Sequence, residues 1–311
     1  MSAVTVLAPA KINLHLEVIG LRPDGFHELA MVMQSLDLVD RLEFSNRADG
    51  AILLRCEGAD LPLDGSNLVV RAAERLRARV GLPELGADLT LEKCIPIGAG
   101  LAGGSSDAAA TLVGLNALWG LRQSQQQLQG LAAELGSDVP FCLEGGTRLC
   151  FGRGERLEPV PQPLTDLGVL LIKDPAAHVS TPWAYGRCRA LREDDYLSSE
   201  ADFEQRRQAL RQAPLLAHLA RGDALQTLRN DLQAVVEPEV SSVSRGLRLL
   251  RGLPSTLAVA MSGSGPTLFA LFPGRRQAEE ARERLGPALH EAGFDAWSCG
   301  CRSRGVSLEA T

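Results

Sequence analysis

The sequence lacks any long apolar run. No stretch of its 311 residues approaches the roughly 18 consecutive apolar residues that a membrane-spanning helix needs. The opening residues, MSAVTVLAPA, contain neither a basic segment nor a cleavage signal. We therefore expect a cytoplasmic protein with no membrane partner.

Positive charge is also scarce. Acidic residues outnumber lysine and arginine by 38 to 32, which gives a net charge of −6 and a pI near 5.5. Such a balance argues against a nucleic acid as partner. Lysine itself is retained only at Lys11, Lys93 and Lys173. Because lysine supplies a compact, movable charge that arginine does not, each retained lysine is a candidate for a specific role.

Paired cysteine motifs are missing as well. The seven cysteines are scattered through the chain, and none forms a C-x-x-C pair. An odd, scattered set is typical of reduced core thiols, and it argues against a disulfide framework or a zinc site.

The length and the mixture of strand and helix patterns indicate an α+β protein of two domains. At 45% hydrophobic and 23% charged residues, the chain suffices for two ordinary cores. Prolines at 159, 161 and 163 predict a boundary between domains 1–160 and 161–311. Periodicity predicts strands at 4–19, 89–95, 169–172, 257–260 and near Trp297, a hairpin at 145–157, and helices at 67–80, 107–118, 124–135 and 275–291. The polar stretch 186–230 is predicted to form a solvated helical cover.

One glycine-rich loop has the composition of an anion site. Four glycines are followed by two serines, an aspartate and an alanine-rich run that favours a helix: Gly98, Gly100, Gly103, Gly104, Ser105, Ser106 and Asp107. Glycines let the backbone approach a ligand, and the first turn of a helix offers unpaired N–H groups and the positive end of its dipole. The same residues also allow a simple tight turn with Ser105 or Ser106 as the helix N-cap.

Two other kinds of phosphate-binding loop have related sequence patterns. Gly98, Gly100 and Gly103 satisfy the GxGxxG pattern of dinucleotide-binding oxidoreductases. The acidic residue expected after the next strand is absent from 118–122, and the loop does not open the domain, so this alternative is the weaker one. A Walker A loop is excluded because no Gly-Lys-Ser/Thr follows the last glycine.

The loop resembles the second motif of the GHMP kinases, the family of galactokinase, homoserine kinase, mevalonate kinase and phosphomevalonate kinase. There a Pro-x-Gly-x-Gly-Leu-x-x-Ser-Ser core holds the ATP triphosphate against a helix N-terminus. The resemblance implies ATP binding by Pro96, Ile97, Gly98, Ala99, Gly100, Leu101, Ala102, Gly103, Gly104, Ser105 and Ser106. It also implies Mg²⁺, with Ser105 or Ser106 as a ligand. The implied fold has an N-terminal nucleotide-binding α/β domain and a C-terminal ferredoxin-like domain.

Three further segments resemble parts of the same family. PAKINL, 9–14, is similar to the first motif, whose lysine reaches the phosphate-accepting hydroxyl; strict alternation from Lys11 places Lys11 and Asn13 on one face of a strand. SGSGPT, 262–267, is similar to the third motif, which packs beside the first two. GSDVP, 136–140, is similar to the segment whose aspartate, here Asp138, takes the proton from that hydroxyl. Without the resemblance, Asp138 would be interpreted as a cap or turn former.

Within the family, the extra glycine pair and Asp107 resemble the members that phosphorylate the 2-hydroxyl of a cytidine diphosphate-linked methylerythritol for isoprenoid synthesis. RPDGFHEL, 22–29, agrees, because Phe26 offers a stacking face and His27 a hydrogen bond to cytosine. Those members ordinarily carry tyrosine where this chain has Phe26. The resemblance further implies substrate contacts from Asn13, Lys93, Thr181, Tyr185 and Ser264, with Lys93 near the cytidine and Tyr185 as a second plane around the base.

The implied reaction is ATP-dependent phosphorylation of a small alcohol, with Asp138 as base and Lys11 favouring the developing alkoxide. The alternatives are a GHMP kinase acting on homoserine or mevalonate, a dinucleotide-binding oxidoreductase, and a catalytically silent nucleotide-binding protein. The RPDGFH segment argues against the first, and the presence of both Lys11 and Asp138 argues against the last. We expect a monomer or a homodimer.

Overall fold

The computed structural model describes residues 3–225 and 227–309. Its strands are β1 (Val4–Leu21), β2 (His27–Arg47), β3 (Ile52–Glu57), β4 (Gly86–Glu92), β5 (Thr147–Gly152), β6 (Arg156–Pro159), β7 (Gly168–Lys173), β8 (Ala258–Met261), β9 (Leu268–Phe272), β10 (Asp295–Arg302) and β11 (Ser307–Leu308). Its helices are α1 (Leu68–Val80), α2 (Gly103–Leu118), α3 (Gln125–Leu135), α4 (Val139–Glu144), α5 (Thr181–Arg192), the 3₁₀ helix η1 (Glu193–Asp195), α6 (Glu200–Arg211), α7 (Leu215–Arg221), α8 (Gln233–Val236), α9 (Ser241–Arg251) and α10 (Arg275–Ala292).

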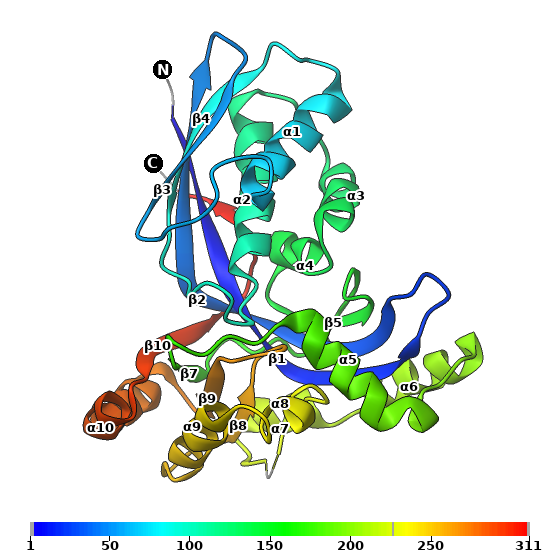
Figure 1. Ribbon diagram of the computed structural model, residues 1–311, viewed down its shortest axis with the longest axis vertical. Helices are drawn as coiled ribbons and strands as arrows, with labels where there is room; N and C mark the ends of the chain where they lie inside the picture. Colours follow the sequence, from blue (N-terminus) through cyan, green and yellow to red (C-terminus); the bar gives the residue numbers. More distant parts are fainter. Residues whose placement is uncertain (1–2, 226, 310–311) are drawn as a thin grey trace.

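The long antiparallel pair β1 and β2 connects the two parts of the molecule seen in Figure 1. In the upper part, α1 to α4 lie on one side of β1 to β4. Strand β2 also pairs with β10, so the sheet continues in the order β11-β1-β2-β10-β7-β9-β8 into the lower part. The predicted α+β class is confirmed.

Strand β1 carries an irregularity at its centre. Asn13 and His15 pair with consecutive residues of β2, so Leu14 between them has no partner on that strand. An extra residue of this kind reverses which face the following side chains occupy. Leu14 and Leu16 consequently pack into two different hydrophobic cores. The strict alternation predicted from Lys11 onward therefore holds through Leu14 and is wrong beyond it.

Helix α2 is the central helix of the upper part. It packs against α1, α3, α4, β1 and β2, and its residues 106–112 are buried without interruption. A Cβ on Gly114 would lie 2.3 Å from the Phe44 ring, so glycine is required for this close packing. The predicted burial of this helix is confirmed, but the helix begins at Gly103, four residues before the predicted start.

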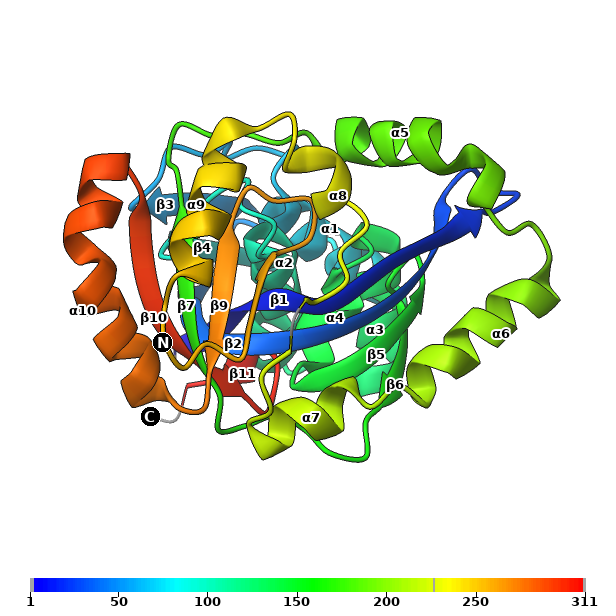
Figure 2. The same cartoon turned by 90° about the horizontal axis from the view of Figure 1, so that it is seen from below.

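The lower part has an antiparallel sheet in the order β10-β7-β9-β8. Apolar residues of α9 and α10 share one core with alternate residues of β7 and β9, so both helices cover one face (Figure 2). The stretch 186–230 forms most of α5 and then η1, α6 and α7, with α5 and α6 beside the free end of the β1–β2 pair (Figure 2). This cover is not simply solvated, because the side chain of Arg207 in α6 is fully buried.

In residues 3–225 and 227–309, no helix combines the length and the apolar character needed to cross a membrane.

Candidate active site

Lys11 of β1 lies at the centre of the site. Its Nζ donates to Asn13 Oδ1 at 2.7 Å and to the carbonyl oxygen of Gly100 at 3.1 Å, and it lies 3.6 Å from Asp138 Oδ2. The Lys11 side chain is 5% exposed, whereas that of Asp138 is 31% exposed. Asp138 precedes α4 but makes no side-chain cap bond to it. The carboxylate is thus held beside an ammonium and remains accessible to a small molecule.

The glycine loop has a backbone that suits anion binding. Gly98 and Gly100 have φ values of 60° and 74°, and Ala102, at the N-cap of α2, has a φ of 57°. Ala102 offers no side-chain acceptor to the first-turn N–H groups of α2. Ser105 and Ser106 lie inside the helix, so the alternative with either as N-cap is wrong. Amides at the positive end of a helix, left without a side-chain cap, favour an anion.

The SGSGPT loop packs directly on the glycine loop. Ser262 Oγ donates at 3.0 Å to the carbonyl oxygen of Gly100, the same atom that accepts from Lys11. A Cβ on Gly100 would lie 2.3 Å from the carbonyl oxygen of Ser262, so no side chain fits there. On the other side of the SGSGPT loop, Ser264 Oγ lies 2.8 Å from Thr181 Oγ1 at the start of α5. The three sequence motifs therefore meet around Gly100.

Two buried oxygen atoms behind the glycine loop have no hydrogen-bond partner among the described residues. They are Ser106 Oγ and Asp107 Oδ1. Burial raises the pKa of Asp107 to about 8, against the attraction of the Lys93 ammonium 2.9 Å away. Hydroxyl and carboxylate oxygens are the donors that Mg²⁺ prefers, so this donor set fits such an ion. Ser105, the other predicted ligand, is partly exposed in the same turn.

The sequence predicts that Lys93 contacts the substrate, but in the structure its side chain is not free to do so. Its side chain is 4% exposed, and its ammonium contacts the carboxylates of Asp40 and Asp107. Burial opposes its charge, but the two carboxylates outweigh that effect and raise the pKa of Lys93. Asp40 also accepts the backbone N–H groups of Cys94 and Ile95 at 2.6 and 2.7 Å. Lys93 thus joins the two ends of the glycine loop.

An aromatic cluster lies at the turn between β1 and β2. The His27 ring stacks on Tyr185 of α5 with centroids 4.9 Å apart, and it meets Tyr196 edge-on at 5.8 Å. Phe26 is 50% exposed, with the Arg153 guanidinium 4.8 Å from its ring centroid.

Burial lowers the pKa of His27, and so does the charge of Arg189. The neutral ring has one donor and one acceptor nitrogen, and its Nε2 is buried with no partner in the described part of the chain. Burial, with the negative charge of Asp138 as the next contribution, raises the pKa of Tyr185. The cluster is therefore uncharged, apart from the Arg153 guanidinium at its edge.

The structure gathers most of the predicted residues into two groups. Lys11, Asn13, Asp138 and the two glycine loops form one group, and His27 with Tyr185 forms a second. Lys93 adjoins the glycine loop, but its ammonium is already paired with Asp40 and Asp107.

Asp40 and Arg153 are not predicted from the sequence, whereas the segment Asn230-Asp231-Leu232 resembles a family signature with a structural role. Asn230 Nδ2 holds the backbone of the SGSGPT loop, donating to the carbonyl oxygens of Met261 and Gly263 at 2.8 and 2.9 Å. An acidic residue inside an apolar strand, as Asp40 is, was the available signal for a buried ion pair.

Comparisons with known proteins agree over almost the whole chain. The family model "GHMP kinases N terminal domain" matches residues 67–146, and "GHMP kinases C terminal" matches residues 207–291. Proteins named 4-diphosphocytidyl-2-C-methyl-D-erythritol kinase are 61% identical in Prochlorococcus marinus (strain MIT 9303) and 60% identical in Synechococcus sp. (strain CC9605). Both matches cover 99% of this chain, with 96% and 100% of the relatives covered.

Solved structures of similar proteins share the fold. A crystal structure of 4-(cytidine 5'-diphospho)-2C-methyl-D-erythritol kinase is 34% identical, with a TM-score of 0.74 over 96% of this chain and 98% of that one. Homoserine kinase from Cytophaga hutchinsonii has a TM-score of 0.75 at 18% identity, over 99% and 98% of the two chains, and supports the fold alone. The predicted two-domain architecture is confirmed, while the boundary near residue 160 stays a prediction.

Proposed function

The chain belongs to the GHMP kinase family, and we propose on that basis that it transfers the γ-phosphoryl group of ATP to the 2-hydroxyl of 4-diphosphocytidyl-2-C-methyl-D-erythritol. Relatives about 60% identical over the full length carry the name of that kinase. The observation that carries the chemistry is the contact between Lys11 and Asp138 beside the Gly100 carbonyl. It provides an acid–base pair next to a loop suited to phosphate.

Asp138 is proposed as the general base. An alcohol is a poor nucleophile at pH 7, so its proton must leave as the oxygen attacks the γ-phosphorus. The proton passes from the 2-hydroxyl to the Asp138 carboxylate, the new P–O bond forms, and the bond to the β-phosphate oxygen breaks to release ADP. The Lys11 ammonium, fixed by Asn13 and Gly100, stabilises the negative charge that develops on the attacking oxygen.

The glycine loop and the first turn of α2 are proposed to hold the triphosphate. Their N–H groups lie at the positive end of a buried helix, and phosphoryl transfer depends mainly on positioning and on charge stabilisation. Ser106, with Ser105 and Asp107 as its neighbours, would hold Mg²⁺ with the phosphates; such an ion neutralises phosphate charge when bound. The loop positions from Pro96 to Ser106 are proposed to contact the nucleotide.

The aromatic cluster is proposed to recognise the cytosine. Phe26 supplies an exposed stacking face, and the neutral His27 supplies a hydrogen-bonding nitrogen. Tyr185 packs on His27, so its face is partly used within the protein and it orients His27 as well as bordering the base. Asn13, Thr181 and Ser264 are proposed to contact the rest of the substrate. Lys93 is left out because its ammonium is already paired.

The test is ADP release with Mg²⁺, ATP and one alcohol at a time. The cytidyl substrate is compared with homoserine, mevalonate and galactose, and we expect release with the cytidyl substrate alone. Asp138→Asn and Lys11→Ala should each lower kcat by about 10²- to 10⁴-fold while ATP still binds. Asp49→Asn, at an exposed carboxylate paired with Arg47, is the control and should keep full activity.

The outcomes separate the parts of the proposal. Turnover of homoserine or mevalonate in place of the cytidyl substrate would reject the substrate and leave the kinase. Near-normal turnover in Asp138→Asn would reject the base.

A further inference from the structure

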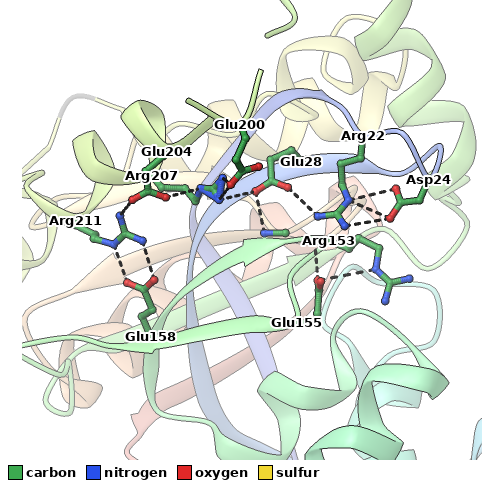
Figure 3. A network of polar contacts seen from close by, with 11 residues as sticks. Arg22, Asp24, Glu28, Arg153, Glu155, Glu158, Glu200, Glu204, Arg207 and Arg211 are labelled. Carbon is green, nitrogen blue, oxygen red and sulfur yellow. Dashed lines mark hydrogen bonds and ion pairs between the residues drawn. The ribbon is translucent and has the colours of Figure 1, made fainter. Parts of the chain in front are cut away.

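A cluster of charged residues lies behind the turn that carries Phe26 and His27, and none of its members is among the residues proposed to touch ATP or substrate (Figure 3). At its centre is Arg207 of α6, whose side chain is 0% exposed. Its guanidinium contacts Glu200 and Glu204 on its own helix and lies 3.7 Å from Glu28 on β2. Arginine side chains are almost never fully buried unless they are paired, so the burial of this one on a polar helix indicates a specific role for its ion pairs.

Glu28 connects this arginine to the turn. It is 2% exposed and follows His27 directly in the chain. One carboxylate oxygen lies near Arg207 and accepts the N–H of Gly152 at 3.2 Å; the other accepts from Arg22 at 3.0 Å. A buried carboxylate held by two guanidiniums has little freedom to move, because leaving either partner would expose an uncompensated charge.

The contacts continue from Arg22 into the turn itself. The Arg22 guanidinium donates to both oxygens of Asp24, and Asp24 Oδ1 accepts the backbone N–H of Phe26 at 3.1 Å. Charged groups therefore connect α6 to the backbone of Phe26 without a break: Arg207, Glu28, Arg22 and Asp24. Figure 3 shows these side chains in that order.

The Glu28 carboxylate also holds the hairpin of β5 and β6. Gly152, which donates to Glu28, precedes Arg153, and the Arg153 N–H donates to Glu155 at 2.7 Å. The Arg153 guanidinium lies over Phe26. Glu28 thus fixes the turn that bears Phe26 and the hairpin that bears Arg153, which are the two sides of the exposed aromatic ring.

We propose that Glu28 and Arg207 are positioning residues for recognition of the base-bearing end of the substrate. They hold Phe26, His27 and Arg153 in one arrangement, so that binding the base does not require ordering the turn. The proposal rests on the proposed function, since it takes the aromatic cluster as the site of the base. It assigns no role to either residue in ATP binding or in the transfer step.

The experiment compares Glu28→Gln, Arg207→Met and Arg207→Lys with the wild type and with Arg211→Met. Arg211 is the matched control because it lies on the same helix and pairs with Glu158 and Glu204, yet has no contact with Glu28 or the turn. The measurements are KM for each substrate, kcat, the Kd of CDP by calorimetry, and Tm.

We expect Glu28→Gln and Arg207→Met to raise KM for the cytidyl substrate and the Kd of CDP by about tenfold, a factor that corresponds to ~1.4 kcal/mol. KM for ATP and saturating kcat should stay within about twofold of the wild type, the scatter that a difference of ~0.4 kcal/mol produces. Arg207→Lys keeps the charge and should recover part of the CDP affinity, and it serves if Arg207→Met fails to fold. Arg211→Met should leave both KM values unchanged.

Two results would overturn this inference while leaving the proposed function standing. One is a wild type that uses the cytidyl substrate while Glu28→Gln and a folded Arg207→Met bind CDP normally. The other is a parallel rise in both KM values with a lower Tm, because that pattern belongs to general destabilisation. A wild type that neither binds CDP nor uses the cytidyl substrate would reject the proposed function and this inference together.

Discussion

Replacing Lys93 with methionine should destabilise the protein and loosen the glycine loop. The substitution keeps most of the side-chain volume and removes the ammonium that lies between Asp40 and Asp107. Asp40 would retain the N–H groups of Cys94 and Ile95, but Asp107 would lose a contact of 2.9 Å in a buried position. Removing one partner of a buried ion pair leaves an uncompensated charge, which costs about 3–5 kcal/mol.

That free energy can be converted into a shift in melting temperature. At about 2.1 cal/mol/K per residue, the 311 residues have an unfolding entropy of ~0.65 kcal/mol/K, so the loss corresponds to a Tm lower by ~5–8 °C if the chain unfolds as one unit. The shift should lie at the low end, because Asp107, whose pKa burial raises to about 8, is already largely protonated near pH 7, and Asp40 keeps two N–H donors when the ammonium is gone. ATP affinity should fall too, since the contact with Asp107 closes the loop.

Thermal unfolding by circular dichroism and ATP binding by calorimetry test this account. The matched control is Lys173→Met, because Lys173 is 5% exposed but donates to the backbone carbonyls of Asp174 and Pro175. Its loss strands no carboxylate, so its Tm should fall less and ATP affinity should hold. An unchanged Tm, with only KM for the cytidyl substrate raised, would refute the structural role and restore the substrate contact predicted from sequence.

Two further predictions concern the same loop. Gly100→Ala should lower ATP affinity more than tenfold, because φ is 74° and the added Cβ would lie 2.3 Å from the Ser262 carbonyl oxygen. The control is Gly120→Ala, where φ is 62° and no atom lies within 4 Å of the added Cβ. It isolates the backbone strain of ~1–2 kcal/mol and should leave ATP binding intact. Burial raises the pKa of Asp107 from 3.8 to about 8, so this group stabilises the fold most at low pH and its contribution is lost as pH rises between those values. The Tm of Asp107→Asn relative to wild type should therefore rise from pH 5 to pH 8 and level off above; a flat difference contradicts the burial of an acid there.

Much of the candidate active site could be predicted from sequence because its parts are local. The glycine loop, the PAKINL strand and the GSDVP turn each place their candidate groups within a few residues, so each segment can be matched to a family motif from the sequence alone. The burial of α2 followed likewise from a run that is apolar nearly all round. That these segments form one site depends on their contacts at Gly100. The spacing within each segment does not predict those contacts, and only the resemblance to a family implied them.

The errors arose where distant residues meet. The sequence predicts a substrate contact for Lys93 because its partners Asp40 and Asp107 lie 53 and 14 residues away, and no local pattern indicates an ion pair across such separations. Arg207 was placed on a solvated surface because a polar helix reveals nothing of Glu28, which approaches from β2. The start of α2 was placed too late because Ala102, with its left-handed backbone, has no sequence signature of an N-cap.

The unpaired Leu14 of β1 also has a consequence for how this strand tolerates insertions and deletions. A deletion of one residue there would give a more regular ladder with β2, yet Leu16 and the side chains after it would exchange the core they now fill for the opposite one. Lys11, on the near side, would keep its place beside the glycine loop. The irregularity at Leu14 therefore fixes the register of β1 with β2. A shift of one position would leave the half with Lys11 in place but would turn the half from Leu16 onward, which joins the strand to its helical cover, to the wrong face.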